Sequence, residues 1–317
     1  MSKPLLQANK LGKAFASRSL FRKHSFQAVQ DVSFRLHAGE ILAIVGESGS
    51  GKSTIARMIT NLIPPSEGEV LYDGIALKGN TALQKKLPTK VQMIFQDPFA
   101  ALNPHHRIGY IIGRPLKVHG IVPGDVRSKV LQLLNQVGLT PAEDFIDKYP
   151  YQLSGGQKQR VMIAKVLGLD PKIIVADEPT SMLDVSIGID IMNLMLDLKE
   201  HRQLGYILIT HNLGSARYMA DRIMVMFAGQ IVEQGPTEEL IAQPKHPYTK
   251  LLLQSSPEPW REMAWEPIEM IEPAGKPLPQ SGCRFQHRCP FVQDSCRHQP
   301  VAMRAAGEGY EVRCTLY

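Results

Sequence analysis

The sequence predicts an α/β fold with a mixed sheet at its core, and three observations support this prediction. Short apolar runs such as Ile41–Val45 and Ile173–Ala176 lead directly into a glycine or an acidic pair, as buried strands of such a sheet do. Residues 97–165 instead show the apolar spacing of helices. Residues 1–45 alternate apolar and polar side chains, which favours antiparallel strands. We therefore expect an antiparallel β part, a mixed sheet and a helical insertion.

The composition is that of a globular protein, since 44% of the 317 residues are hydrophobic and 21% are charged. No apolar run approaches the about 18–20 residues that span a bilayer, and Met1–Phe15 lacks the layout of a signal peptide. We therefore expect a chain that stays in the cytoplasm and acts at a membrane only through partners. The net charge of +6 is spread along the chain without a basic run, so no nucleic-acid partner is expected.

The remaining elements follow from local patterns. A turn at His37–Gly39 precedes the strand Ile41–Val45, and Pro64-Pro65 stops a helix that we expect over Thr54–Leu62. Further strands are predicted at Val91–Phe95, Tyr206–Ile209, Arg222–Gln230 and Ile231–Gly235, with a turn centred on Gly229. Beyond Pro244 the chain is rich in proline, so we expect it to be extended and loop-like.

A phosphate-binding loop follows the first buried strand. Gly46-Glu47-Ser48-Gly49-Ser50-Gly51-Lys52-Ser53 matches G-x-x-x-x-G-K-[ST] between a strand and a helix. Its glycines let backbone N–H groups turn toward phosphate oxygens, and the helix directs its positive end at the same anion. Lys52 is expected to reach the β- and γ-phosphates and Ser53 to bind Mg²⁺. The residues predicted to bind nucleotide here are Gly46, Ser48, Gly49, Gly51, Lys52, Ser53 and Thr54.

Two acidic residues end the buried strand Ile173–Ala176. Asp177 is expected to hold Mg²⁺, and Glu178 is expected to polarise or deprotonate the attacking water. An acidic pair after a strand is often only a capping feature, so this assignment depends on the motifs around it.

A second anion-binding motif, Leu153-Ser154-Gly155-Gly156-Gln157, precedes the helical stretch Lys158–Leu167. One chain with one phosphate-binding loop does not need a second such motif. Two chains do, if each chain closes its motif on the ATP of the other. The residues predicted to contact nucleotide across such a dimer are Ser154, Gly155, Gly156 and Gln157.

The order of these motifs resembles that of ABC transporter nucleotide-binding subunits over roughly residues 5 to 240. The resemblance is carried by the phosphate-binding loop, Gln96, Leu153–Gln157, Asp177-Glu178, Ser181-Met182-Leu183-Asp184 and His211. It implies a P-loop NTPase ABC nucleotide-binding domain with a mixed sheet core, an antiparallel β subdomain and a helical subdomain, followed here by a small Cys-rich C-terminal extension. It also implies hydrolysis of ATP to ADP and phosphate, coupled to translocation.

The resemblance assigns further roles to single residues. Gln96 resembles the glutamine that senses Mg²⁺ and water, and His211 the switch histidine that contacts the γ-phosphate and Glu178. Asp184 resembles the acid that crosses the dimer interface, and Phe15 the aromatic residue that stacks on adenine. The implied catalytic residues are Glu178, His211 and Gln96, and the implied Mg²⁺ ligands are Ser53, Gln96 and Asp177. The sequence departs from the family pattern at Lys158, Met182 and Asn212, none of which removes a charge needed for hydrolysis.

Two segments resemble the peptide-importer branch, whose members transport dipeptides, oligopeptides or nickel. They are Phe95-Gln96-Asp97-Pro98-Phe99-Ala100-Ala101-Leu102-Asn103-Pro104 and His246-Pro247-Tyr248-Thr249-Lys250-Leu251-Leu252. The branch implies a second ATPase chain (a copy of this one or a paralogue), two transmembrane permeases and an extracytoplasmic substrate-binding protein. It places the chain peripherally on the cytoplasmic face of a bacterial or archaeal plasma membrane.

All four cysteines, Cys283, Cys289, Cys296 and Cys314, lie in the last 35 residues, which predicts one shared site. A cytoplasmic location argues against disulfides. Gaps of 5, 6 and 17 residues lack the short C-x₂-C spacing of many zinc sites, so a [4Fe–4S] cluster is favoured over Zn²⁺. Unliganded thiols in a loose tail are the remaining alternative, and the role of a cluster, structural or redox-sensing, stays open.

We therefore expect an ABC ATPase domain over residues 1–245, with its helical subdomain at about 97–165, and a Pro-rich and Cys-rich domain over 246–317. The function predicted is that of the ATPase subunit of an importer for peptides or related small cargo. An exporter ATPase and an ABC ATPase acting on nucleic acid or ribosomes are the alternatives. A protein whose main role is redox regulation through the cysteine segment is a further one.

Overall fold

The computed structural model describes residues 3–19, 22–255, 268–269, 279 and 281–317. These residues form two compact units. The first unit contains the described residues of 1–5 together with 37–40 and 79–207, and the second contains those of 6–36, 41–78 and 208–317.

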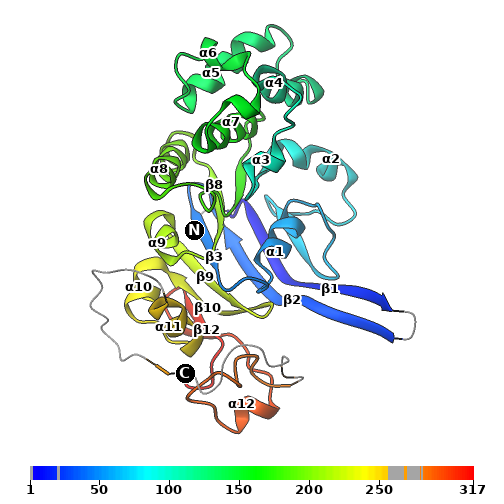
Figure 1. Ribbon diagram of the computed structural model, residues 1–317. Helices are drawn as coiled ribbons and strands as arrows, with labels where there is room; N and C mark the ends of the chain where they lie inside the picture. The colour runs from blue at the N-terminus through cyan, green and yellow to red at the C-terminus, as the bar shows by residue number, and fades with distance from the viewer. Residues whose placement is uncertain (1–2, 20–21, 256–267, 270–278, 280) are drawn as a thin grey trace. The chain divides into compact units, whose positions relative to one another are not determined.

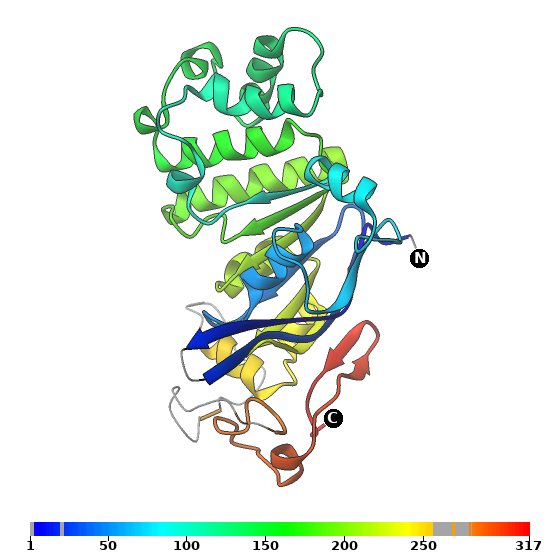
Figure 2. The ribbon, with the colours of Figure 1, turned by 90° about the vertical axis from the view of Figure 1, so that its right-hand side faces the viewer.

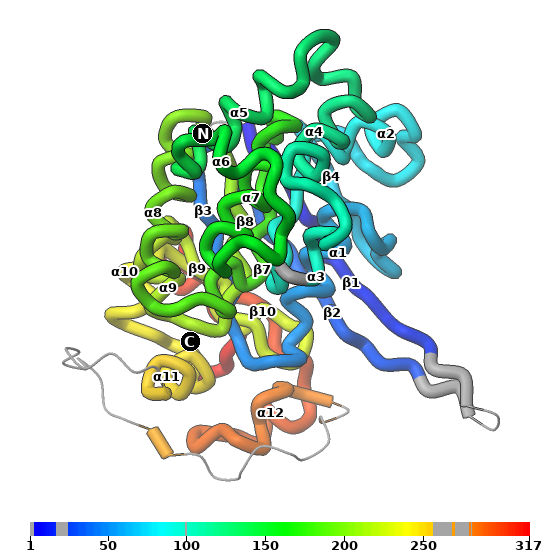
Figure 3. The backbone as a smooth tube through the Cα atoms, turned by 45° about the horizontal axis from the view of Figure 1, so that its top comes forward, coloured from blue at the N-terminus to red at the C-terminus, as the bar shows by residue number. Residues whose placement is uncertain are grey.

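The second unit begins with a long antiparallel hairpin. Its strands are β1 (Leu6–Ser19) and β2 (Arg22–Leu36), which run side by side in Figure 3. β4 (Glu67–Tyr72) and β5 (Ile75–Ala76) complete a four-stranded sheet in the order β2-β1-β4-β5. This sheet confirms the antiparallel strands expected near the N-terminus.

The same unit carries a mixed sheet built on β3 (Ile41–Val45), all of whose residues are buried. β3 is parallel to β9 (Arg222–Phe227), and β9 pairs antiparallel with β10 (Gln230–Pro236) across the turn at Ala228-Gly229. The last residues of the chain extend this sheet, because β12 (Tyr310–Val312) pairs with β10 and β11 (Arg304–Gly307) pairs with β12. Figure 2 shows this terminal hairpin in red.

Helices of the second unit connect these strands. They are α1 (Lys52–Ile59), α9 (Leu213–Met219), α10 (Thr237–Ala242), α11 (Pro247–Gln254) and α12 (Ser295–His298), all labelled in Figure 1. β8 (Gly205–Thr210) is fully buried and contributes its first half to the first unit and its second half to the second.

The first unit combines two parallel strands with a group of helices. β6 (Val91–Ile94) and β7 (Ile173–Asp177) are parallel, with Ile94 opposite Ala176. The helices are α2 (Thr81–Lys90), α3 (Pro98–Ala101), α4 (Ile108–Val118), α5 (Val126–Gln136), α6 (Glu143–Ile146), α7 (Gly155–Leu167) and α8 (Val185–Arg202), with a 3₁₀ turn at Pro150–Gln152. α4, α5 and α7 contact one another and bury Ile112, Leu133 and Ile163 completely. Within this group, α3 to α7 run from Pro98 to Leu167, where the sequence predicted helices at about 97–165.

Two predicted elements differ from the structure for local reasons. The helix expected over Thr54–Leu62 spans Lys52–Ile59, because Gly51 occupies the N-cap and Asn61 has a φ of 58° that a helix cannot continue. The tail beyond Pro244 is not all loop. α11 starts at Pro247, where the missing N–H of a proline costs nothing, and the His246 side chain caps it. The segments 256–267 and 270–278, with five of the tail prolines, lie outside the described residues.

None of the helices in the described part of the chain has the length and apolar character needed to cross a membrane.

Candidate functional site

The phosphate loop, residues 46–53, joins β3 to α1 within the second unit. Its backbone is held by turn hydrogen bonds, from Ser50 N to Glu47 O at 3.2 Å and from Gly229 N to Ser50 O at 2.8 Å. α1 begins directly after Gly51, so the first N–H groups of the helix, which have no acceptor within the helix, lie at the loop. This arrangement has the features of an anion site at a helix N-terminus.

Two positions of the phosphate loop require glycine. Gly46 has a φ of 154°, and a Cβ there would lie 2.2 Å from the Met226 carbonyl oxygen. Gly51 has a φ of 104°, and a Cβ there would lie 2.5 Å from the Ala28 carbonyl oxygen. Both distances are shorter than any real contact, so the loop can adopt this path only without side chains at these positions.

The Lys52 ammonium is folded back over the loop. Its Nζ donates hydrogen bonds to the carbonyl oxygens of Gly46 at 2.8 Å and Glu47 at 2.9 Å, and the residue is only 6% exposed. The cation is thus anchored within the loop, from which it can turn to a phosphate. Ser53 is exposed and Thr54 is half-buried on the first turn of α1.

In the first unit, the side chains of Gln96 and Glu178 meet beyond the carboxyl ends of two parallel strands. Gln96 lies two residues after β6, and Glu178 directly follows β7. Gln96 Nε2 donates a hydrogen bond of 2.9 Å to Glu178 Oε2. Parallel neighbouring strands bring their carboxyl ends to one edge of a sheet, so two motifs that are 82 residues apart meet there.

Glu178 also has an unusual backbone. Its φ of 48° lies in the left-handed region, which is uncommon for a residue with a side chain and often marks a functional position. Ser181 stabilises this turn, since both its N–H and its hydroxyl donate to the Glu178 carbonyl oxygen, at 3.2 and 3.1 Å. Asp177, the last residue of β7, is buried.

The signature loop, Leu153–Gln157, forms the N-terminus of α7. Ser154 Oγ accepts a hydrogen bond from Gln157 N at 3.3 Å, and Gln157 Oε1 accepts one from Ser154 N at 3.0 Å. This reciprocal capping box stabilises the start of the helix. A Cβ on Gly156 would lie 2.6 Å from Ile187 Cγ2, so only glycine allows α7 to begin this close to α8.

The remaining predicted residues lie at element ends or on the hairpin. Asp184 is exposed at the N-cap of α8, and His211 is exposed directly after β8. Phe15 pairs with Phe26 across β1 and β2, is 42% exposed, and has the Lys13 ammonium 5.4 Å from its ring centroid. The phosphate loop, Phe15 and His211 belong to the second unit. The Gln96–Glu178 pair, Asp177, the signature loop and Asp184 belong to the first.

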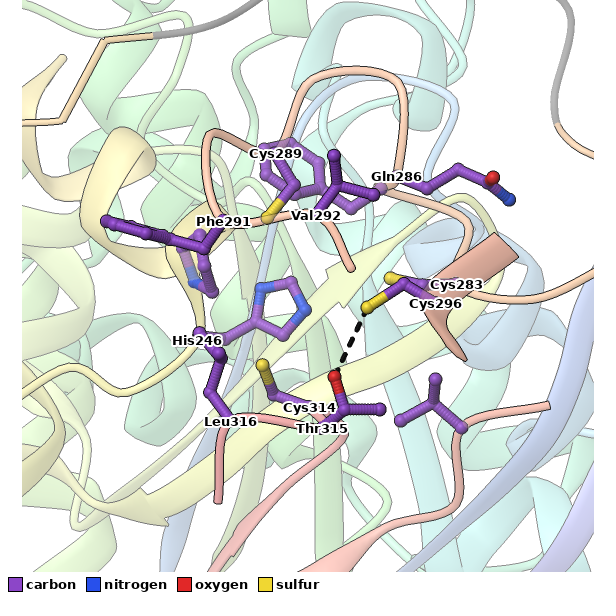
Figure 4. Close-up of a pocket in the computed structure, with 13 residues that line it drawn as sticks. His246, Cys283, Gln286, Cys289, Phe291, Val292, Cys296, Cys314, Thr315 and Leu316 are labelled. Atoms are coloured by element: carbon purple, nitrogen blue, oxygen red, sulfur yellow. Dashed lines mark hydrogen bonds between the residues drawn. The ribbon is translucent and has the colours of Figure 1, made fainter. Parts of the chain in front are cut away.

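The four cysteines line one pocket in the second unit, which we call the cysteine pocket. Their side chains project into it together with that of His246 (Figure 4), and Phe285 also lines it. The backbones of Cys283 and Cys296 are hydrogen-bonded, from Cys283 N to Cys296 O at 2.7 Å. All four cysteines are free thiols. The structure therefore brings together the cysteines that the sequence predicted to share one site.

Burial in this pocket favours neutral thiols. It raises the pKa of Cys283 to about 11 and that of Cys289 to about 12, and it raises the pKa of Cys314 as well. It also lowers the pKa of His246 to about 3, so the imidazole is neutral and its Nδ1 can accept a hydrogen bond from Tyr248 N at 3.0 Å. Thiolates in this place therefore require a compensating positive charge.

The described part of the chain contains no group of three or more His, Cys, Asp or Glu side chains placed to hold one metal ion. A single zinc ion would need its four sulfurs about 3.8 Å apart, given its tetrahedral geometry and bond length. The pocket thus unites the cysteines without the close set of ligands that one ion requires, and neither the zinc nor the cluster prediction is confirmed.

Sequence reasoning missed two residues that contact the phosphate loop from within the second unit. Arg288 donates two hydrogen bonds to the Glu47 carboxylate, and the Tyr248 hydroxyl accepts one from Glu47 N. Tyr248 belongs to the segment that resembles the peptide-importer branch, which was a signal of its importance but not of its contact. Arg288 had no signal, because Glu47 lies 241 residues away along the chain.

Two family models match the chain. The model described as ABC transporter matches residues 29–181, and the model described as Oligopeptide/dipeptide transporter, C-terminal region, matches residues 232–296. The first match contains the phosphate loop, the signature loop and the acidic pair. The second contains α11 and three of the four cysteines.

Curated relatives match along almost the whole chain. The chain is 40% identical over 316 residues to the dipeptide transport ATP-binding protein DppF of Haemophilus influenzae, covering 98% of this chain and 96% of the relative. It is 41% identical over 321 residues to the oligopeptide transport ATP-binding protein OppF of the same organism, with 98% and 96% coverage. The corresponding values for the oligopeptide transport ATP-binding protein AppF of Bacillus subtilis are 41% over 325 residues, with 99% and 97% coverage.

Solved structures share the fold of the ATPase part. The cbiO1 protein of Clostridium perfringens, part of the ABC transporter complex cbiONQ, matches with a TM-score of 0.66 and 28% identity, covering 76% of this chain and 92% of that one. The dimeric ATP-binding cassette MJ0796, bound to ADP and Pi in a post-hydrolysis state, matches with a TM-score of 0.64 and 30% identity, covering 73% and 98%.

Proposed function

We propose that this chain, which belongs to the ABC transporter family of ATP-binding proteins, is the ATP-hydrolysing subunit that powers an importer of peptides. One observation carries the proposal: about 40% identity to dipeptide and oligopeptide transport ATP-binding proteins extends over nearly the whole chain, including the C-terminal region. The ATPase part alone would leave the cargo open, because transporters of many kinds share it. The region beyond about residue 245 is what narrows the proposal to peptide import.

The proposed reaction is the hydrolysis of ATP to ADP and phosphate. The phosphate loop cradles the phosphates with its backbone N–H groups, and Lys52 moves from its carbonyl partners to the β- and γ-phosphates. Ser53, Gln96 and Asp177 offer the oxygen ligands that Mg²⁺ prefers, and the ion would neutralise charge on the phosphates. Glu178, oriented by Gln96, accepts a proton from the attacking water, and His211 contacts the γ-phosphate.

We also propose that the working unit is a dimer of ATPase chains. In it, the signature loop and Asp184 of one chain face the nucleotide bound by the phosphate loop of the other. The exposed N-terminal end of α7, capped by Ser154, supports this arrangement because it is a second anion site that the chain's own loop does not require. The dimeric state of the cassette MJ0796 supports it independently. The partner is a second copy of this chain or a paralogue.

The permeases are proposed to dock at a basic groove in the first unit. The groove, of about 570 Å³, lies around α4 and is lined by His105, His106, Arg107, Arg114, Lys117 and Arg127. Asp147 is the one acidic residue of the lining, and hydrogen bonds from Arg127 and Arg107 lower its pKa. Tyr110 adds an apolar ring that is 51% exposed. We propose that the groove receives a cytoplasmic permease segment with acidic side chains, which places the chain peripherally on the membrane with a substrate-binding protein outside it.

We propose a [4Fe–4S] cluster in the cysteine pocket. The donor set fits, because four thiols from different segments line one space, and such clusters take four cysteine ligands. A cluster also spaces its ligands more widely than one zinc ion does, because four irons and four sulfides separate them. The ligands would be Cys283, Cys289, Cys296 and Cys314, and the bound group would cross-link the C-terminal region and supply a redox-active centre.

A transport assay tests the proposed function. Cells that lack the chain's own gene, and that depend on an external dipeptide for a required amino acid, should grow when the wild-type chain is restored. They should not grow with Lys52→Ala, which removes the phosphate ligand. Purified protein should hydrolyse ATP without nucleic acid. Restored export of a compound, or an ATPase rate that rises only with DNA or ribosomes, would overturn peptide import.

A further inference from the structure

The C-terminal region, beyond about residue 245, contacts one residue of the phosphate loop. Arg288 Nη2 donates to Glu47 Oε1 at 2.9 Å and Arg288 Nη1 donates to Glu47 Oε2 at 3.1 Å. Together these two hydrogen bonds form a bidentate guanidinium–carboxylate pair. The Arg288 side chain is only 14% exposed, whereas that of Glu47 is 44% exposed. Ion pairs between exposed side chains contribute little, but a pair with one partner largely buried and two parallel hydrogen bonds is held in a single geometry.

A second contact reaches the backbone of the same residue. Glu47 N donates a hydrogen bond of 2.9 Å to the hydroxyl oxygen of Tyr248, a side chain of α11 that is 1% exposed. The Glu47 carbonyl oxygen accepts a hydrogen bond from the Lys52 ammonium. The N–H, the carboxylate and the carbonyl of Glu47 therefore all have partners, and two of these come from the C-terminal region.

Arg288 and Tyr248 are held by an aromatic cluster that also borders the cysteine pocket. The ring centroid of Phe285 lies 5.3 Å from that of Phe227 and 5.5 Å from that of Tyr248, and the Arg288 guanidinium carbon lies 5.5 Å from the Phe285 ring centroid. Phe285 lines the cysteine pocket, and Arg288 directly precedes Cys289. A continuous chain of contacts thus leads from the cysteines through Phe285 and Arg288 to Glu47.

We propose that Arg288 and Tyr248 are positioning residues for nucleotide binding, and that through them the order of the cysteine pocket sets the affinity of the phosphate loop for ATP. The inference rests on the proposed ATP-binding function. By fixing Glu47 from both its backbone and its side chain, the two residues hold the loop in the shape that turns its N–H groups toward phosphate. Preorganisation of this kind raises affinity because the loop loses less freedom on binding.

The pair Arg288 and Arg297 allows a matched test. Arg288 directly precedes Cys289 and Arg297 directly follows Cys296, but Arg297 is exposed on α12 and, among the described residues, makes no hydrogen bond or ion pair with the phosphate loop. The full-length protein, purified without air, is titrated with Mg·ATP at low temperature for wild type, Arg288→Gln, Glu47→Gln, the double variant, Tyr248→Phe and Arg297→Gln. We expect Arg288→Gln and Glu47→Gln each to weaken binding about 5–10-fold, and the double variant to be no weaker than either single one. Tyr248→Phe should weaken it about 3-fold, and Arg297→Gln should leave it unchanged.

A second readout separates positioning from a loss of folding. Because coupling between sites is reciprocal, Mg·ATP should slow backbone hydrogen exchange in the segment Phe285–Cys289 of wild type, as measured by mass spectrometry, and this protection should be lost in Arg288→Gln but kept in Arg297→Gln. Thermal unfolding of the nucleotide-free variants checks that they are folded. If wild type fails to bind Mg·ATP, the proposed function is wrong. If wild type binds but Arg288→Gln binds equally well, or the double variant shows additive losses, or nucleotide gives no Arg288-dependent protection, the positioning role is wrong.

Discussion

Gln96 and Glu178 form a hydrogen bond of 2.9 Å between a side-chain amide and a carboxylate, although the two residues follow different strands. The amide donates through its nitrogen, so the Glu178 carboxylate oxygen is the acceptor of this contact. The same hydrogen bond selects one rotamer of Glu178, whose backbone is already turned sharply by its positive φ. The pair is therefore a site where the orientation of the Glu178 carboxylate controls the proposed hydrolysis.

Replacing Glu178 with Gln should keep nucleotide binding and abolish turnover. The amide cannot accept the proton of the attacking water, so the rate of ATP hydrolysis should fall at least about 100-fold. The dissociation constant for Mg·ATP should change little, and size-exclusion chromatography with ATP should show a trapped dimer. Glu200→Gln, on the exposed face of α8, is the matched control and should behave as wild type. Normal turnover in the Glu178 variant would remove this residue from the role of base.

Replacing Gln96 with Ala should lower the rate of hydrolysis about tenfold, since a hydrogen bond to a charged group contributes about 1.5 kcal/mol. The affinity for Mg·ATP should fall less than the rate does, because the phosphate loop supplies most of the phosphate contacts. Pre-steady-state kinetics can separate the two quantities. A variant in which only the affinity falls would identify Gln96 as a nucleotide ligand with no influence on Glu178.

Two glycines of the phosphate loop should respond differently to an added methyl group. Gly51→Ala places its Cβ 2.5 Å from the Ala28 carbonyl oxygen, so the loop must move, and ATP binding should be lost. Gly49 also has a positive φ, of 79°, but a Cβ there meets nothing within 4 Å. Gly49→Ala should therefore cost only the backbone strain, about 1 kcal/mol, and retain measurable binding. Equal effects in a nucleotide titration would show that close packing does not shape the loop.

Iron analysis should find about four irons and about four sulfides per chain after purification without air. Cys314→Ser should lose most of this iron, because the pocket then offers three thiols, and the broad absorption near about 400 nm should weaken with it. Ser281→Ala, which removes a hydroxyl outside the ligand set, is the control. One zinc per chain, or neither metal, would overturn the cluster proposal. The proposed ATPase activity would be unaffected by either result.

Lys165 on α7 should make stability depend on pH in the alkaline range. Burial lowers the pKa of its ammonium, whereas the unfolded chain keeps the ordinary value of 10.5. As the pH rises, the folded state therefore releases this proton before the unfolded state does. The free-energy cost of burying the ammonium, which destabilises the folded state at lower pH, disappears as the pH rises toward 10.5. Lys165→Met should raise the melting temperature by a few degrees at pH 7.5, and this gain should shrink between pH 9 and 10.5. Lys117→Met, on the exposed face of α4, should show no such trend.

Much of the fold could be predicted because its signals are local. A continuous apolar run identified β3 and β7, and the phosphate loop lies within eight consecutive residues. The terminal strands β11 and β12 were missed because they span only four and three residues, and the edge of β10 is what orders them. α11 was missed because prolines suggested a loop, although Pro247 stands at the one helical position that favours proline.

In the candidate site too, some residues could be predicted from local patterns and others could not. Lys52, Ser154 and Glu178 follow from motifs whose spacing is tied to their chemistry. The hydrogen bonds of Arg288 and Tyr248 with Glu47 depend on how α11 and the cysteine segment pack within the second unit. No local pattern in the sequence encodes that packing. The shared pocket of the cysteines was predictable from clustering alone, but the spacing of their sulfurs was not.

The pairing of β12 with β10, and of Arg288 with Glu47, has a consequence for synthesis on the ribosome. A chain emerging from the exit tunnel can fold β3 and α1 early, but the partners of Glu47 arrive about 200 to 240 residues later. Contacts of such long sequence separation form late and slowly. A prematurely terminated chain would therefore carry the complete G-x-x-x-x-G-K-S motif without its C-terminal supports. Such fragments should be poor competitors for ATP and for the partner subunit, and exposed edges at β10 should direct them to proteolysis.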